Sequence, residues 1–172
     1  MRREVLTWND VDKLIDHLIP QFDTEFDAMV VITRGGIVPG GMLAEALNLT
    51  AILTAAVDFP AESEDNDVQQ KQQTRWMAWP KFIQFPETNL LEGKKVLIVD
   101  DVWGSGRTIT AVKNRISAAS AKVYTSVLHF NPYRNLFGTL RPDYYAATTD
   151  TFIIYPWEVR RGQEGVLLSN TF

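Results

Sequence analysis

The chain has 172 residues, a length that suits one domain with its own hydrophobic core. Apolar residues make up 45% of the chain and charged residues 22%, as in ordinary globular proteins, and the formal net charge of -4 gives no basic field that would attract nucleic acid. The absence of cysteine excludes disulfides and thiolate catalysis, and two histidines are too few for a histidine-rich metal site.

The first residues, MRRE, lead into a polar amphipathic segment, so we expect no signal peptide. No stretch approaches the roughly 20 apolar residues that a membrane-spanning helix requires. We therefore expect a cytoplasmic protein that binds neither a membrane nor nucleic acid.

The first predicted element is a helix: residues 7–10 (TWND) offer capping residues, apolar side chains follow at helical spacing from Val11 to Leu18, and Pro20 closes the segment. Residues 28–33 are apolar and rich in β-branched side chains, which predicts a buried strand. Two glycines break this strand, a helix is predicted from residue 37, and residues 50–57 predict a second strand. This order predicts a right-handed βαβ unit.

Residues 58–80 contain few apolar side chains and predict a long mobile loop, which is often a lid over a site in a compact domain. Further strands are predicted at residues 81–85, 95–100, 122–129 and 150–155, and a helix at residues 108–119. The alternation of strands and helices predicts an α/β fold with a parallel sheet.

The segment VLIVDDVWGSGRT at residues 96–108 carries the main chemical signal. A buried strand delivers Asp100 and Asp101 to its carboxyl end, where ligands bind to open α/β sheets. The turn that follows contains Gly104 and Gly106, whose backbone N–H groups can approach a phosphate at a helix N-terminus. Two carboxylates next to a phosphate site suit ribose hydroxyls or a Mg²⁺ ion.

This segment resembles the motif with which type I phosphoribosyltransferases bind 5-phosphoribosyl-1-pyrophosphate (PRPP). The resemblance implies that Asp100 and Asp101 hold the ribose hydroxyls and face Mg²⁺. It also implies that the loop wraps the 5-phosphate with the consecutive residues Gly104, Ser105, Gly106, Arg107 and Thr108.

Two further segments resemble the bacterial and archaeal xanthine-guanine (hypoxanthine) phosphoribosyltransferases. Around Arg34 and Gly35, the sequence ITRGGIVP is similar to the pyrophosphate loop of this family, where the peptide bond is often cis. The sequence DTFIIYPWE is similar to the family's hood: Phe152 would stack on the base, Ile153 would offer its carbonyl, and Glu158 would lie near Mg²⁺. Residues 58–80 take the place of the flexible catalytic loop.

The resemblance implies a single phosphoribosyltransferase domain over residues 1–172. A parallel twisted sheet flanked by helices would form a core of about residues 25–130, and about residues 131–172 would form a small hood with the N-terminal segment. The catalytic residues would be Arg34, Asp100 and Asp101. The family also leads us to expect a homo-oligomer.

Two positions depart from the family pattern. Gly104 stands where many 6-oxopurine enzymes have an aspartate near the purine N7, and Asn131 stands where they have a lysine that contacts the 6-oxygen. An amide can donate a hydrogen bond to an oxygen or accept one from an amino group. Asn131 is therefore a candidate contact to the base, and it leaves open which base is accepted.

Three functional hypotheses follow from these residues. The first is transfer of the phosphoribosyl group to a purine base in salvage. The second is a regulatory protein that binds PRPP or a nucleotide without turnover, and the third is transfer to a non-purine base at the same PRPP site. For single residues, Phe152 is either a base contact or core packing, and Trp103 either packs beneath the sheet edge or shields the ribose.

Overall fold

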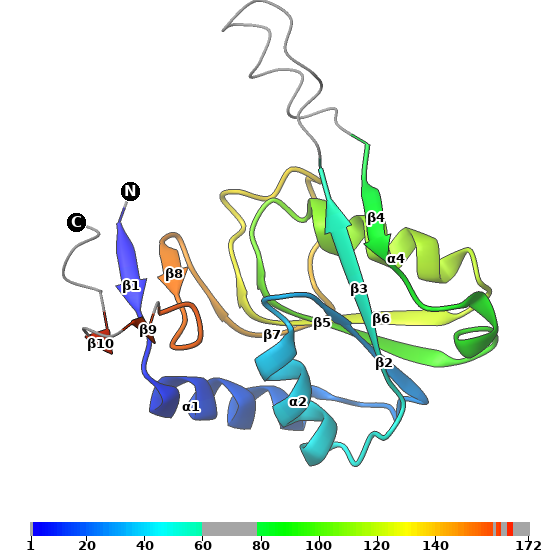
Figure 1. Cartoon of the computed structure of the whole chain (residues 1–172), viewed down its shortest axis with the longest axis horizontal. Coiled ribbons are helices and arrows are strands. Elements are labelled where there is room, and N and C mark those ends of the chain that lie inside the picture. Colours follow the sequence, from blue (N-terminus) through cyan, green and yellow to red (C-terminus); the bar gives the residue numbers. More distant parts are fainter. Residues whose placement is uncertain (1, 60–78, 160, 163–164, 167–172) are drawn as a thin grey trace, which may run out of the picture.

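The computed structural model describes residues 2–59, 79–159, 161–162 and 165–166 (Figure 1). Most of the predicted loop at residues 58–80 lies outside the described residues. Within the described part of the chain, every helix is too short or too polar to cross a membrane.

A six-stranded sheet forms the centre of the fold, with the strand order β4-β3-β2-β5-β6-β7. Neighbouring strands from β3 to β7 are parallel, and β4 is antiparallel to β3 at the edge, so the predicted parallel α/β sheet is confirmed. The strands span Ala28–Ile32 (β2), Ile52–Asp58 (β3), Lys81–Gln84 (β4), Lys95–Trp103 (β5), Lys122–Phe130 (β6) and Tyr144–Thr148 (β7).

Helices cover both faces of this sheet. The helices α1 (Trp8–Leu18) and α2 (Ile37–Ala46) lie on one face, and α4 (Arg107–Ser117) lies on the other (Figure 1). Because side chains alternate along a strand, Met29 packs in the core with α1 and α2, whereas Val30 packs in the core with α4. Burial on both faces explains why the central strands are continuous apolar runs.

The first helix has the ends that the sequence predicts. Thr7 is its N-cap and forms a capping box with Asp10, and the 3₁₀ turn Ile19–Gln21, which contains Pro20, follows its last residue. The helix therefore has a defined start, and Val11, Ile15 and Leu18 face the core.

A second, small sheet joins the two ends of the chain. Strand β1 (Arg3–Val5) pairs in parallel with β8 (Phe152–Ile154), and the pair lies beside the carboxyl ends of β5 and β6 (Figure 1). A short antiparallel pair, β9 (Arg161–Gly162) and β10 (Gly165–Val166), follows. Strand β1 was not predicted from the sequence, because its three exposed residues have no strand pattern of their own.

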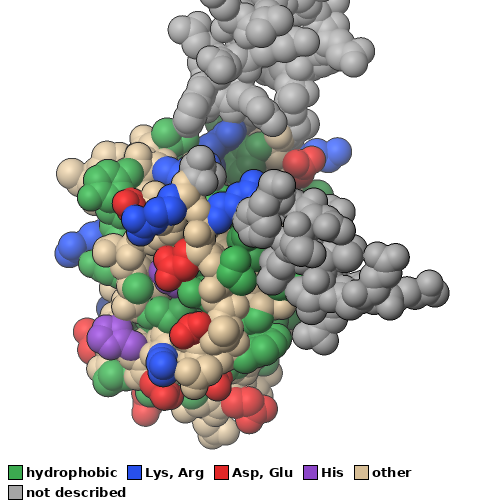
Figure 2. Space-filling model, turned by 90° about the vertical axis from the view of Figure 1, so that its left-hand side faces the viewer, with side chains coloured by type: hydrophobic (Ala, Val, Ile, Leu, Met, Phe, Trp, Pro, Cys, Tyr) green, Lys and Arg blue, Asp and Glu red, His purple; other side chains and the backbone are tan. Residues whose placement is uncertain are grey.

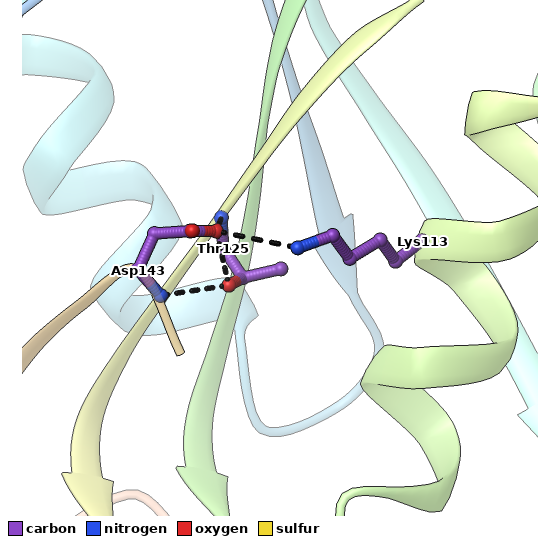
Figure 3. A network of polar contacts seen from close by, with 3 residues as sticks. All are labelled: Lys113, Thr125 and Asp143. Atoms are coloured by element: carbon purple, nitrogen blue, oxygen red, sulfur yellow. Dashed lines mark hydrogen bonds and ion pairs between the residues drawn. The ribbon is translucent and has the colours of Figure 1, made fainter. Parts of the chain in front are cut away.

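A polar network holds β7 at the other edge of the main sheet (Figure 3). The Asp143 carboxylate accepts hydrogen bonds from the backbone N–H and the hydroxyl of Thr125, at 2.8 and 2.7 Å, and Lys113 on α4 lies 3.6 Å away. In return the N–H of Asp143 donates to the Thr125 hydroxyl at 3.0 Å. Strand β7 thus belongs to the central sheet, although it falls in the range expected for the hood.

Candidate functional site

The central strand β5 places two acidic residues at its carboxyl end. Asp100 and Asp101 follow the buried run of this strand, which continues to Trp103, beyond the predicted residues 95–100. Their side chains point to opposite faces of the sheet, because successive residues of a strand alternate. The backbone N–H of Asp101 donates a hydrogen bond to the side-chain carboxylate of Asp100 at 3.0 Å.

Burial and mutual repulsion act on these carboxylates together. Burial raises the pKa of Asp100 well above its ordinary value, and the neighbouring charge of Asp101 adds to the effect. Burial also raises the pKa of Asp101 to about 6, with a further contribution from the charge of Glu158. Hydroxyl donors or a cation at this point would relieve the repulsion.

The loop after β2 lies directly against the acidic pair. A Cβ atom at Gly35 would come within 2.5 Å of three atoms of the Asp101 carboxyl group, and one at Gly36 would collide with the Val99 carbonyl. Only glycine fits at either position. The Thr33–Arg34 peptide bond is cis, as the resemblance implied. This loop therefore presents its backbone beside the carboxylates, and the exposed Arg34 begins it.

The loop after β5 forms the other wall of the site. Gly106 has a left-handed backbone with a φ of 79° and is the N-cap of α4, whose first residue is Arg107. A Cβ at Gly106 would lie 2.5 Å from the indole nitrogen of Trp103. The N–H of Arg107 donates to the Ser105 hydroxyl at 3.4 Å. Thr108 lies in the first turn of α4, and the N-terminus of a helix attracts anions.

Trp103 packs beneath this loop, which decides between the two interpretations given above. Its side chain is buried, makes an edge contact with Phe130 and donates its indole N–H to Asn135 at 3.2 Å. The guanidinium of Arg107 lies 4.2 Å from the ring centroid of Phe59, a contact at the end of β3 that the sequence did not predict.

The residues expected to contact the base, Phe152 and Ile153, lie on β8 of the small sheet. The side chain of Phe152 is 40% exposed, whereas Ile153 is buried in the core. The N–H of Phe152 donates to Arg2 and the carbonyl of Ile154 accepts from Leu6, so alternate peptide groups of β8 bond to β1. The peptide groups of Ile153 consequently point away from β1, toward an edge of β8 that no other described strand covers.

The side chain of Asn131 is occupied by the turn that follows β6. It is 2% exposed, and its amide oxygen accepts hydrogen bonds from the N–H groups of Tyr133 and Arg134 at 3.1 and 3.2 Å. This oxygen therefore stabilises the turn, a role that was not predicted from the sequence.

Glu158 is close enough to influence Asp101 electrostatically, but its carboxylate accepts a hydrogen bond from the N–H of Tyr155 at 2.8 Å. Among the residues that the structure describes, no three His, Asp or Glu side chains gather closely enough to hold a metal ion alone. Of the expected set of Asp100, Asp101 and Glu158, the first two are adjacent on β5, and Glu158 uses one carboxylate oxygen to cap its own turn.

Two buried residues next to the acidic pair were not predicted as part of the site. The hydroxyl of Tyr155 donates to the backbone carbonyl of Asp101 at 3.0 Å, and Nδ1 of His129 lies 2.9 Å from that hydroxyl. Burial lowers the pKa of His129 to about 4. The sequence gives one signal for Tyr155, which is its position at the end of an apolar strand. A tyrosine hydroxyl that is buried there needs a hydrogen-bond partner.

The face on which β1 and β8 lie shows how charge is arranged around this region (Figure 2). Lys and Arg side chains gather on it above acidic side chains. Acidic residues at a strand end, a backbone loop on one side and a helix N-terminus on the other are typical of α/β proteins that bind phosphate-bearing ligands at the carboxyl ends of their strands.

The comparisons identify the family within this class. The family described as "Phosphoribosyl transferase domain" matches residues 4–167, and the chain belongs to this family of enzymes. A xanthine-guanine phosphoribosyltransferase of Roseobacter denitrificans is 27% identical over 133 residues, which cover 77% of this chain and 68% of the relative. Another, from Cereibacter sphaeroides, is 29% identical over 136 residues, which cover 77% and 69%.

Solved structures agree with this assignment. A purine phosphoribosyltransferase from Pyrococcus horikoshii has a TM-score of 0.73 at 26% identity, with 92% of this chain and 95% of that chain covered. A Neisseria gonorrhoeae protein with bound ppGpp has a TM-score of 0.74 at 25% identity, with 91% and 89% covered. The expected phosphoribosyltransferase fold is thus confirmed.

The contact between Gly35 and the acidic pair leads to a first prediction. In Gly35→Ala, the added methyl group would displace the Asp101 carboxylate, and we expect PRPP to bind about 10- to 100-fold more weakly, because hydrogen bonds to a charged group are lost. Isothermal titration calorimetry measures this change. Gly41→Ala on α2 is the control, since its Cβ would meet no described atom within 4 Å; equal binding by both variants would contradict the prediction.

The raised pKa of Asp101 leads to a second prediction. The pKa is about 6 in the folded protein and 3.8 ordinarily, so the folded state holds this proton more tightly than the unfolded state. Stability should therefore fall as the pH rises through this interval. Asp101→Asn removes the ionisation, and its melting temperature relative to the wild type should increase from pH 4 to about pH 6 in metal-free buffer. A constant difference would contradict the assignment.

Proposed function

We propose that this protein transfers the 5-phosphoribosyl group of PRPP to a purine base, which gives a nucleoside monophosphate and pyrophosphate in nucleobase salvage. The observation that carries the proposal is the acidic end of β5 enclosed between the Arg34–Gly35 loop and the N-terminus of α4. The names of the relatives support a purine as the acceptor.

The PRPP half of the site is assigned by chemistry. Asp100 and Asp101 accept hydrogen bonds from the ribose hydroxyls, which donate to carboxylates. The 5-phosphate is held by the loop residues Gly104, Ser105 and Gly106 and by the first turn of α4, with Arg107 and Thr108. The N-terminus of a helix attracts an anion, and the side chains of Ser105 and Thr108 carry hydroxyls. Arg34 and Gly35 hold the departing pyrophosphate.

Mg²⁺ fits this site as an ion shared with the substrate. Asp100 and Asp101 are hard oxygen donors whose charges repel each other. Mg²⁺ in proteins is commonly bound through one or two carboxylates together with substrate phosphates, so the lack of a third close carboxylate does not disfavour it. When bound, Mg²⁺ neutralises charge on pyrophosphate. The negative charge of Glu158 would attract the Mg²⁺ ion without direct contact.

The chemical step depends on position and electrostatics. The bond between the ribose C1 and the pyrophosphate oxygen breaks, the electron pair leaves with pyrophosphate, and a purine nitrogen attacks C1. Phe152 stacks on the base and the carbonyl of Ile153 accepts from it. Asn131 acts on the base-binding side of the site indirectly, because its side chain stabilises the turn after β6. The N–H proton of the attacking purine passes to solvent or to the departing pyrophosphate, because the chain has no carboxylate at Gly104 to take it.

A regulatory function is the second candidate. The Neisseria gonorrhoeae neighbour is a protein with bound ppGpp, and the missing carboxylate at Gly104 favours binding without turnover. The intact pyrophosphate loop favours the enzyme, because a protein that only senses PRPP needs no exit site for pyrophosphate.

For location and assembly, we propose that the protein is cytoplasmic and forms a homo-oligomer.

Pyrophosphate release from PRPP and Mg²⁺ tests the proposed function, with hypoxanthine, guanine, xanthine, adenine, uracil and orotate as acceptors. We expect turnover with a purine and none with uracil or orotate. The double variant Asp100→Asn, Asp101→Asn should neither bind PRPP nor turn over. Binding of PRPP by the wild type without any turnover would contradict the enzyme and favour the regulator, whereas normal PRPP binding by the double variant would contradict the site.

Gly104 leads to a prediction about the acceptor. A Cβ added there would meet no described atom within 4 Å, so an aspartate side chain has room. We expect Gly104→Asp to raise kcat for 6-oxopurines about tenfold or more, since a positioned acid or base typically contributes at least that much. Gly104→Asn is the matched control without the carboxylate. Equal kcat values for the two variants would show that no base is missing at this position.

A further inference from the structure

One side chain connects the two halves of the proposed site. Tyr155 directly follows β8, the strand of Phe152 and Ile153, and its ring is only 1% exposed. Its hydroxyl donates to the backbone carbonyl of Asp101 at 3.0 Å. A single hydrogen bond therefore joins the segment expected to hold the base to the residues expected to hold the ribose.

His129 on β6 supports this contact from the side. Its Nδ1 atom lies 2.9 Å from the Tyr155 hydroxyl. Because that hydroxyl has one proton and gives it to the Asp101 carbonyl, His129 must carry its own proton on Nδ1 and donate it. The low pKa of His129 agrees with a neutral ring, and burial keeps the hydroxyl of Tyr155 protonated by raising its pKa.

The ring of Tyr155 is held in one orientation by its neighbours. It stacks on Trp157 with a centroid distance of 4.6 Å and an interplanar angle of 7°, and Trp157 contacts Trp8 of α1 at 6.0 Å. The backbone N–H of Tyr155 donates to Glu158 at 2.8 Å. With its ring, hydroxyl and backbone all engaged, Tyr155 has little freedom to move relative to β5.

We propose that Tyr155, oriented by His129, is a positioning residue that sets the distance between the base-binding strand β8 and the ribose-binding end of β5. The inference rests on the proposed function. Attack by the base requires its nitrogen to lie close to C1 in a defined direction, and a shift of about 1 Å can lower the rate about 100-fold. Neither PRPP nor the base needs to touch Tyr155 for this effect.

The test compares two tyrosines that each lose one hydrogen-bonded hydroxyl. Tyr155→Phe removes the bond to the backbone carbonyl of Asp101, and Tyr144→Phe removes a bond to the carboxylate of Asp23 at 2.7 Å, between β7 and the segment that follows α1. Both variants should lose stability, because each leaves an acceptor without its donor. Only Tyr155→Phe should lower kcat, by about 10- to 100-fold, while the dissociation constant for PRPP stays within about twofold of the wild type.

The outcomes separate this inference from the proposed function. A wild type without turnover contradicts both, whereas an active wild type with equal kcat values for Tyr155→Phe and Tyr144→Phe contradicts the positioning role alone. A large rise in the PRPP dissociation constant would also overturn it, because the defect would then lie in the PRPP site itself.

A second pair of variants tests the chain of hydrogen bonds without altering Tyr155. His129→Asn keeps a donor near the position of Nδ1 and should retain most of the activity, whereas His129→Leu should lower kcat with little effect on PRPP binding. Nitrogen NMR of the imidazoles should find the proton of His129 on Nδ1 in the wild type and on Nε2 in Tyr155→Phe. With His17 as the only other histidine, the signals are readily assigned. Equal kcat values for both His129 variants, or a proton on Nε2 in the wild type, would contradict the proposal.

Discussion

The burial of two adjacent carboxylates at the end of the central strand is the constraint around which this protein is arranged. Strands β2 and β6 flank β5 and keep water from its apolar part, so the chain delivers Asp100 and Asp101 into surroundings that raise the pKa of both. A buried pair of like charges is unfavourable unless something neutralises or bonds to it. Hydroxyl donors and a cation, as in the proposed function, would relieve this cost.

The glycine loops follow from the same constraint. For a backbone to approach the carboxylates, the side chains in its path must be absent, as they are at Gly35 and Gly36. On the other side, Gly106 lets the chain turn tightly over Trp103 into the N-terminus of α4. In the proposed function, one loop serves the leaving group and the other the 5-phosphate. The small sheet of β1 and β8 closes the region and is tied to β5 through Tyr155.

Much of this arrangement could be predicted from local sequence. The apolar run of β5, the glycines after it and the capping residues of α1 are short-range signals, and each corresponds to an element of the fold. Strands β1 and β7 could not be predicted, because β1 exists through its pairing with β8 and β7 is held by Asp143 against Thr125. The same reason applies to Tyr155 and Asn131, whose roles depend on partners distant in sequence or on the exact path of a turn.

A crystal structure of the protein with PRPP and Mg²⁺ would show whether the carboxylates of β5 hold the ribose. We expect the ribose hydroxyls to bond to Asp100 and Asp101, the 5-phosphate to occupy residues 104–108, and pyrophosphate to lie on the backbone after Thr33. A 5-phosphate bound elsewhere, or a ribose out of reach of both carboxylates, would contradict it.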